Sequence, residues 1–141
     1  MSALVDRELA GVRDASRVVL AGFSEGAQLA SYVQLAHLDY ALGGVAVLDG
    51  YPLPPLCHMP GADPAAARAN ATYVGGDMNW MIWWGESDTI FPVDASMAAY
   101  RGIFAALGIE DALKVEHTEP GQPHDLTEAE IARLMSFVRA N

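Results

Sequence analysis

Short runs of apolar residues alternate with longer helical segments along most of the chain. The runs are too short for helices and rich in β-branched or aromatic residues, which is typical of strands buried on both faces. Strands of this kind that alternate with helices of ten or more residues predict a parallel sheet covered by helices on both faces. We therefore expect an α/β fold with about four mostly parallel strands. The expected strands are residues 17–21, 45–48, 81–84 and 113–118, and the expected helices are 5–12, 25–38, 94–107 and 127–140.

Two local patterns refine these boundaries. Thr127 and Glu130 have the spacing of a capping box, which predicts that the final helix begins at this point. The Ala- and Pro-rich segment 60–69 lies between two apolar segments and predicts a loop that includes one helical turn.

The size and charge of the chain limit the kinds of protein it can be. Its 141 residues fit one globular domain, which needs no disulfide, and Cys57 is the only cysteine. The net charge of −10, from 18 acidic and 8 basic residues, argues against binding to nucleic acid or to an anionic membrane. Charged residues interrupt positions 1–15 and no apolar run could span a membrane, so we expect a cytoplasmic protein without a signal peptide.

Residues 22–26 match the pattern G-x-S-x-G, with Ser24 at the centre. The motif lies directly between a predicted strand and a predicted helix, which is the setting of a nucleophile elbow, a sharp turn that lifts a serine hydroxyl above the sheet. We expect both flanking glycines to make this turn sterically possible. The start of the following helix also favours negative charge that develops on an acyl oxygen. Ser24 is therefore the candidate nucleophile.

Partners for such a serine appear in the expected order. A serine nucleophile needs a histidine base, and the histidine needs a carboxylate that orients it. After a nucleophile elbow these residues follow the chain order Ser, Asp or Glu, His. Asp88 follows the third predicted strand and His124 follows the fourth. Both lie at the carboxyl ends of strands, where α/β sheets build their sites. The sequence thus predicts a triad of Ser24, Asp88 and His124.

Each of these residues also has a purely structural interpretation. Ser24 can be a small residue in a tight turn, and His124 can be a surface histidine in a Pro- and Gly-rich turn. Asp88 can be a turn or helix-cap aspartate, and Glu86 and Asp94 are competing acids nearby. The ordered placement of all three residues favours the triad.

Other reactive side chains have weaker support. Cys57 and His58 are adjacent, but no strand-to-helix turn surrounds them, so a cysteine nucleophile is disfavoured. The histidines and the cysteine lack the spacing of metal ligands, and we expect neither a metal nor another cofactor. We expect His37, His58 and His117 to be structural or exposed. The tryptophans are expected to belong to the core rather than to an acyl pocket, and they are Trp80, Trp83 and Trp84.

Three segments carry a resemblance to a known family: GFSEGA (22–27), WWGESDTIFPVDAS (83–96) and PGQPHDLTEAEI (120–131). They resemble the phospholipase/carboxylesterase family, which includes acyl-protein thioesterases, and more loosely the dienelactone hydrolases. The resemblance implies an α/β-hydrolase fold with Ser24 as nucleophile, His124 as general base and then acid, and Asp88 as its orienting carboxylate. It also implies that the backbone N–H of Glu25 is an oxyanion donor, although the family usually has Gln at this position.

The resemblance begins only at the elbow strand. Family members start with further strands, and a loop after one of them, usually bearing His-Gly, supplies a second oxyanion donor. We therefore expect residues 1–141 to form a partial hydrolase domain without these parts. Loss of one oxyanion donor costs about 3–4 kcal/mol. The strand from Arg17 to Ala21 would also have an unpaired apolar edge, so we expect a protein partner, another copy or a missing part of the protein to cover it.

Two functions follow from these patterns. The first is a serine hydrolase that cleaves carboxylic esters or thioesters through an acyl-enzyme and is incomplete as a lone chain. The alternative is a catalytically weak or silent hydrolase-like subunit that acts as a packing element in a larger assembly. The triad favours the first function, and the missing strands favour the second.

Overall fold

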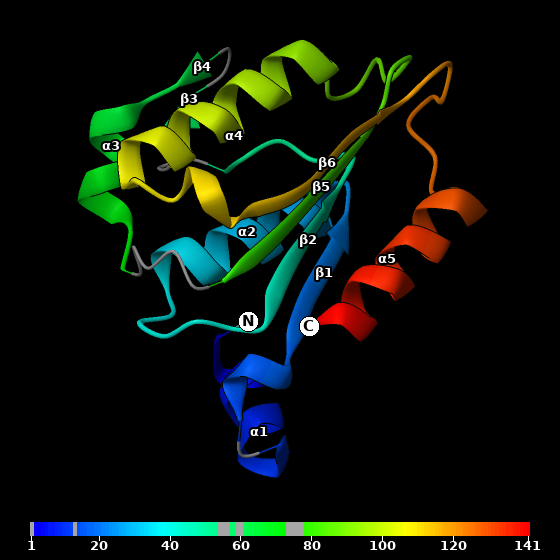
Figure 1. Cartoon of the computed structure of the whole chain (residues 1–141). Helices are drawn as coiled ribbons and strands as arrows, with labels where there is room; N and C mark the ends of the chain where they lie inside the picture. The colour runs from blue at the N-terminus through cyan, green and yellow to red at the C-terminus, as the bar shows by residue number, and fades with distance from the viewer. Residues whose placement is uncertain (1, 13, 54–56, 59–60, 73–77) are drawn as a thin grey trace.

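The computed structural model describes residues 2–12, 14–53, 57–58, 61–72 and 78–141. Its main sheet consists of β1 (Val19–Phe23), β2 (Gly44–Leu48), β5 (Asn79–Gly85) and β6 (Leu113–Glu119). All neighbouring pairs are parallel, and the spatial order is β1-β2-β5-β6 (Figure 1). The predicted α/β fold with a four-stranded parallel sheet is therefore confirmed. All four carboxyl ends meet at one edge of the sheet.

Helices cover both faces of this sheet (Figure 1). One face carries α2 (Glu25–Ala36), α3 (Pro64–Asn70) and α4 (Val93–Leu107), and the other carries α5 (Glu128–Ala140). Helix α1 (Ser2–Val12) lies beyond the end of the sheet at which β1 begins. In the part of the chain that the structure describes, no helix combines the length and the apolar character needed to cross a membrane.

The core follows the alternation of side chains along the strands. In β5, Trp80, Ile82 and Trp84 pack with α2 and α4, whereas Met81 and Trp83 pack with α5 on the opposite face. Every residue of β2 is buried because this strand has a paired neighbour on each side and helices on each face. The tryptophans thus belong to the core, as expected.

Local signals explain where the helices begin and end. The capping box predicted for α5 is present, since the Thr127 side chain accepts from the Glu130 N–H and the Glu130 carboxylate accepts from the Thr127 N–H. Helix α4 ends where Gly108 takes up a left-handed conformation with φ of 70°. The end of α4 and the start of α5 thus set the limits of the segments before and after β6.

Two parts of the structure differ from the sequence-based expectation. The segment predicted as a loop contains the seven-residue helix α3, because Asp63 caps its first turn by accepting from the Ala66 N–H and Pro64 suits the first helical position. A short antiparallel pair precedes it, made of β3 (Cys57–His58) and β4 (Gly61–Ala62).

The first strand also begins later than predicted. Arg17 lies in a single turn of 3-10 helix (Ala15–Arg17) that Asp14 caps, so the elbow strand is Val19–Phe23. Among the described residues, β1 pairs on one side only, with β2. Its residues are half-buried, apart from the exposed Ala21. The apolar edge that the sequence predicted therefore exists, shifted by two residues.

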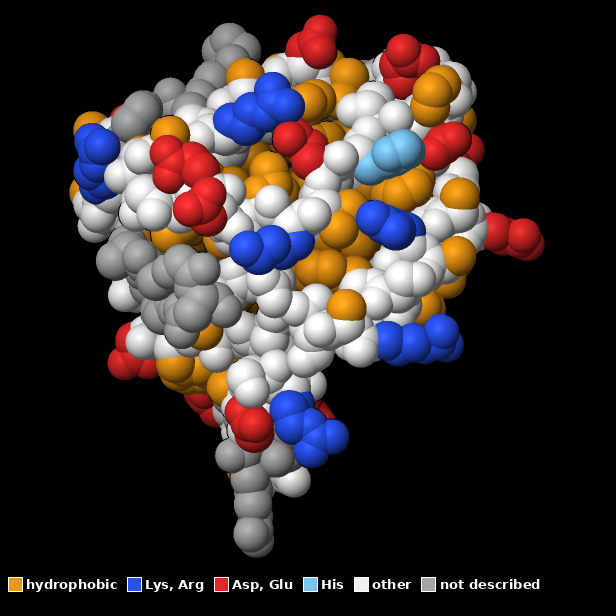
Figure 2. Space-filling view, in the orientation of Figure 1, with side chains coloured by type: hydrophobic (Ala, Val, Ile, Leu, Met, Phe, Trp, Pro, Cys, Tyr) orange, Lys and Arg blue, Asp and Glu red, His pale blue; other side chains and the backbone are white. Residues whose placement is uncertain are grey.

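The face that carries α5 is less completely covered. Two hollows of about 340 and 350 Å³ lie between β6 and α5, and they share Lys114, Val115 and Arg133 in their linings. Figure 2 shows hydrophobic side chains on the floor of a hollow on this side, with Lys, Arg and His side chains around it. Ser24, Asp88 and His124 do not line either hollow.

Candidate active site

Ser24 occupies the turn between β1 and α2. Its backbone has φ of 57° and ψ of −124°, a strained conformation for a residue other than glycine. The turn is held by the Ser24 N–H, which donates to the carbonyl of Leu48 at 2.9 Å, and by the Ser24 carbonyl, which accepts from Ala27 and Gln28. The hydroxyl does not cap the helix. It is therefore free to point away from α2.

The two motif glycines have different roles. A Cβ on Gly22 would lie 2.2 Å from the carbonyl carbon and oxygen of Gly26 and 2.5 Å from the nitrogen of Ala27. Only glycine lets β1 and the first turn of α2 approach this closely. A Cβ on Gly26 would meet no atom within 4 Å. The expectation that both glycines are sterically required is correct for Gly22 and wrong for Gly26.

Asp88 lies in the loop after β5, and its side chain is fully buried. One oxygen, Oδ1, accepts from the N–H groups of Ile90 at 2.7 Å and Phe91 at 2.9 Å. The other, Oδ2, lies 2.7 Å from Nδ1 of His124. Asp88 is thus a turn aspartate and a histidine partner at once, because the turn fixes the carboxylate through the oxygen that His124 does not use.

His124 lies in the loop between β6 and α5. This loop is tied to the Asp88 loop by the N–H of Ser87, which donates to the carbonyl of Gln122 at 2.9 Å. Gly85 allows the close approach, since a Cβ there would lie 2.4 Å from the Gln122 carbonyl oxygen and 2.7 Å from that of Pro123. These contacts hold the histidine over the end of the sheet.

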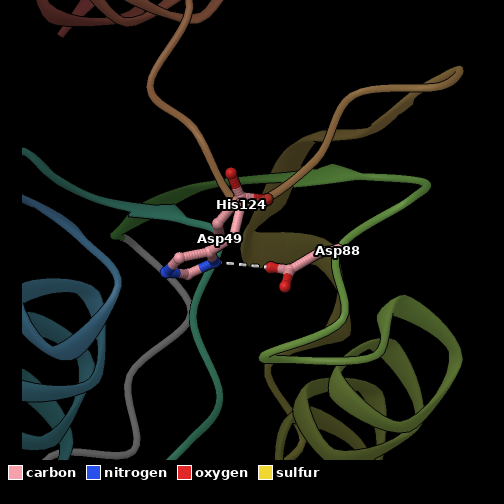
Figure 3. A group of neighbouring side chains, drawn as sticks. All are labelled: Asp49, Asp88 and His124. Carbon is pink, nitrogen blue, oxygen red and sulfur yellow. Dashed lines mark hydrogen bonds and ion pairs between the residues drawn. The ribbon is translucent and has the colours of Figure 1, made fainter.

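The imidazole of His124 links the other two side chains. Its Nε2 lies 2.8 Å from Oγ of Ser24, and its Nδ1 lies 2.7 Å from the Asp88 carboxylate (Figure 3 shows the second contact). An ionised carboxylate can only accept, so Nδ1 carries the proton and Nε2 of the neutral ring accepts from the serine hydroxyl. The ring centroids of Phe23 and Phe91 lie 4.9 and 5.5 Å from that of the imidazole, so these rings shield it from part of the solvent. This arrangement can activate the hydroxyl as a nucleophile.

The competing residues lie elsewhere. Glu86 is exposed and its carboxylate accepts from the N–H of Gly121, and Asp94 is exposed in the first turn of α4. His37 is exposed and contacts the ring of Tyr32. His117 bonds to Glu119 and packs on a tryptophan of β5.

Cys57 and His58 form the short strand β3, not a strand-to-helix turn. The side chains of Cys57 and His58 lie outside what the structure describes. The cysteine nucleophile therefore gains nothing from the fold.

Asp49 is a site residue that the sequence-based reasoning missed. It lies at the carboxyl end of β2, is fully buried, and has φ of 46°. Its Oδ1 accepts from the N–H of Gly85 at 2.6 Å. The pKa of Asp49 is raised to about 6, chiefly by burial; the nearby Glu130 and Asp88 contribute to the rise, whereas the Gly85 N–H and His124 oppose it. The signal was present in the sequence, as an acidic residue directly after the second predicted strand.

Asp49, Asp88 and His124 each offer one ligand-type atom, and these atoms lie within 4.8 Å of one another (Figure 3). One oxygen of each carboxylate is already in use, because Gly85 donates to Oδ1 of Asp49 and the histidine donates its Nδ1 proton to Oδ2 of Asp88. Hydrogen bonding within the site accounts for this cluster, and we assign it no metal.

Comparison with known proteins places this geometry in a family context. The family model described as phospholipase/carboxylesterase matches residues 1–141. The crystal structure of Arabidopsis thaliana SOBER1 is similar with a TM-score of 0.74 at 21% identity, over 98% of this chain and 59% of that chain. Zea mays acyl-protein thioesterase 2 has a TM-score of 0.61 at 17% identity, over 85% and 54% of the two chains. The Bacillus cereus carboxylesterase also has a TM-score of 0.61 at 17% identity, over 96% and 56%.

No curated protein sequence matches the chain. The likeness to the solved structures shows an α/β-hydrolase fold, and the chain spans between one half and three fifths of their length.

Proposed function

The chain belongs to the phospholipase/carboxylesterase family, and on this premise we propose that it is a serine hydrolase that cleaves carboxylic esters or thioesters. One observation carries the proposal: Oγ of Ser24, the imidazole of His124 and the carboxylate of Asp88 form a continuous hydrogen-bonded chain. These residues come from three separate loops, and the turn serine has its hydroxyl directed at a base instead of at the helix it begins.

The proposed reaction has two halves. In the first, Ser24 attacks the acyl carbon while Nε2 of His124 takes the hydroxyl proton, and the imidazolium that forms is stabilised by Asp88. The leaving alcohol or thiol then receives this proton as the bond from the acyl carbon breaks. In the second half, water gives a proton to Nε2 of His124 and attacks the acyl carbon. The bond from that carbon to Oγ of Ser24 then breaks, and His124 returns the proton to Oγ, which releases the carboxylic acid and restores the serine.

The backbone N–H of Glu25 is the proposed oxyanion donor. As the first residue of α2, its N–H has no acceptor within the helix, and it lies at the positive end of the helix dipole. The Glu25 side chain is exposed, so solvent screens its negative charge. A second donor has no counterpart among the described residues before β1, which form α1 and one turn of 3-10 helix.

We therefore also propose that further strands complete the site beside β1. The edge from Val19 to Phe23 is parallel, apolar and half-buried, and it lies next to Ser24. A polypeptide that adds a strand there can bring a second N–H to the oxyanion and remove the exposed edge. A well-behaved monomer of this chain in solution at micromolar concentration, with β1 amides in rapid exchange, would contradict the need for such a cover.

The competing proposal is a hydrolase-like subunit that is weakly active or silent. The unpaired edge of β1 and the short span relative to the solved structures favour it. It predicts an intact fold whose Ser24 does not react.

A fluorophosphonate probe separates the two proposals. We expect covalent labelling of the wild type and none of Ser24→Ala. Ser87→Ala, at an exposed serine in the Asp88 loop, should label like the wild type. Absence of labelling in folded protein, both alone and with its native partners, would remove the enzyme proposal and leave the silent subunit.

A further inference from the structure

A second carboxylate lies behind His124, and the triad does not use it. Asp49 directly follows β2, which lies in the sheet between β1, the strand before Ser24, and β5, the strand before Asp88. Its side chain has no exposure to solvent, and its left-handed backbone is tolerated by Asp and Asn better than by most residues. Buried carboxylates need donors for both oxygens.

The two oxygens of Asp49 are unequally satisfied. Oδ1 accepts from the N–H of Gly85 at 2.6 Å. Oδ2 has one contact, with Nε2 of Gln122 at 3.4 Å. That nitrogen has two hydrogens but lies closer to two other acceptors, Oε2 of Glu130 at 2.7 Å and the carbonyl of Asp125 at 2.9 Å. Both hydrogens are used there, so Oδ2 of Asp49 retains unused acceptor capacity within the described part of the chain.

The groups that face Asp49 explain what this oxygen can receive. Glu130 faces it from α5 and Asp88 from the loop after β5, and both are acidic. Gln122 and Gly85 contribute neutral N–H groups. Among the described residues that face Asp49, His124 is the one that can become positive, and one of its nitrogens lies within 4.8 Å of an Asp49 oxygen. The pKa of Asp49 is raised to about 6, chiefly by burial, so the carboxylate is ionised at pH 8.

We propose, on the premise that Ser24 is the nucleophile of a serine hydrolase, that Asp49 is a second positioning acid for His124. When the Ser24 proton moves to Nε2, Oδ2 of Asp49 stabilises the imidazolium together with Asp88. No bond to Asp49 forms or breaks in this step, and Nδ1 keeps its own proton. When Asp88 cannot accept a hydrogen bond from Nδ1, a small rotation of the imidazole brings the Nδ1 proton to Asp49. The variant then keeps part of the reactivity of Ser24.

Two readouts on the same variants test this proposal. The first is the rate at which Ser24 reacts with a fluorophosphonate in Asp49→Asn, Asp88→Asn and the double variant. We expect Asp49→Asn to react about tenfold more slowly than the wild type, and the double variant at least tenfold more slowly than Asp88→Asn. Asp125→Asn is the matched control, because this exposed carboxylate is adjacent to His124 in sequence. It should react within twofold of the wild type.

The second readout is the titration of the His124 ring by NMR, assigned by its absence in His124→Gln. Removal of a buried negative charge beside the ring should move this titration to lower pH in Asp49→Asn, whereas Asp125→Asn should leave it nearly unchanged. A change of packing alone does not produce this shift. Thermal melting verifies that each variant is folded, and Asp49→Ser replaces Asp49→Asn if the latter does not fold.

The two proposals fail in different ways. A wild type that never labels overturns the serine hydrolase, while the His124 titration still tests the contact with Asp49. A wild type that labels, with the double variant equal to Asp88→Asn and an unchanged His124 pKa in Asp49→Asn, overturns the role of Asp49.

Discussion

Alanine substitutions at the two motif glycines test whether close packing at Gly22, rather than the presence of both glycines of the G-x-S-x-G motif, positions Ser24. In Gly22→Ala the new Cβ would lie 2.2 Å from backbone atoms of Gly26, whereas real Cβ contacts essentially never fall below 3.0 Å. The first turn of α2 must therefore move by about 0.8 Å relative to β1, because no side-chain rotation can relieve a contact with backbone. Ser24 lies between these two segments.

The size of the effect follows from that displacement. A shift of this size along the Ser24–His124 bond, which is 2.8 Å long, takes it beyond hydrogen-bonding distance. Misplacement of about 1 Å can lower a rate about 10²-fold. We expect Gly22→Ala to slow fluorophosphonate labelling by about that factor and to lower the free energy of unfolding by about 1–3 kcal/mol.

Gly26→Ala breaks the same motif without this cost. Its Cβ would meet nothing within 4 Å, and alanine is favoured over glycine in a helix by about 0.5–1 kcal/mol. We expect labelling within twofold of the wild type and a melting temperature that does not fall. The two variants are measured side by side. Equal losses of labelling rate in both variants, or a fully reactive Gly22→Ala, would refute the packing argument.

Three further predictions concern stability and loop placement. The pKa of Asp49 is about 6 in the folded protein against an ordinary value of 3.8, so wild-type stability falls as the pH rises from about 4 to 6. Asp49→Asn should therefore raise the free energy of unfolding by about 1–3 kcal/mol at pH 8. Urea unfolding should show no such gain below pH 4. Gly85→Ala should push the Gln122 carbonyl away and slow labelling more than it lowers the melting temperature, and equal labelling would contradict the close approach of the two loops. Thr127→Ala should cost about 1 kcal/mol by removing a helix cap, and an unchanged melting temperature would show that the capping box contributes little.

The sequence predicted those features that depend on local patterns. The four strands were readable because each is a short apolar run in an alternating series, and the start of α5 because Thr127 and Glu130 form a capping box. Ser24, Asp88 and His124 were readable because the ends of parallel strands meet at one edge, so three separate loops had to converge. Their catalytic roles, and the partner expected beside β1, stay predictions.

One feature that was missed is local, and the others depend on contacts between distant segments. Helix α3 is short, and its composition resembles that of a loop until the cap at Asp63 is seen. The unequal roles of Gly22 and Gly26 depend on how closely β1 approaches α2, which the motif does not encode. Asp49 was not identified as a site residue, because its contact with Gln122 of the His124 loop joins residues 73 positions apart along the chain, and its complete burial is not visible in the sequence.

The hydrogen bond between Ser24 and His124 has a consequence for local unfolding. These residues follow β1 and β6, the two outermost strands of the sheet that the described residues form, whose separation across β2 and β5 is about three strand spacings or 14 Å. Edge strands open more readily than inner ones, and opening at either edge separates the Ser24 hydroxyl from the His124 imidazole. The fraction of molecules in which this hydrogen bond is formed is thus limited by the less stable of the two edges, and amide hydrogen exchange in β1 and β6 reports that limit directly.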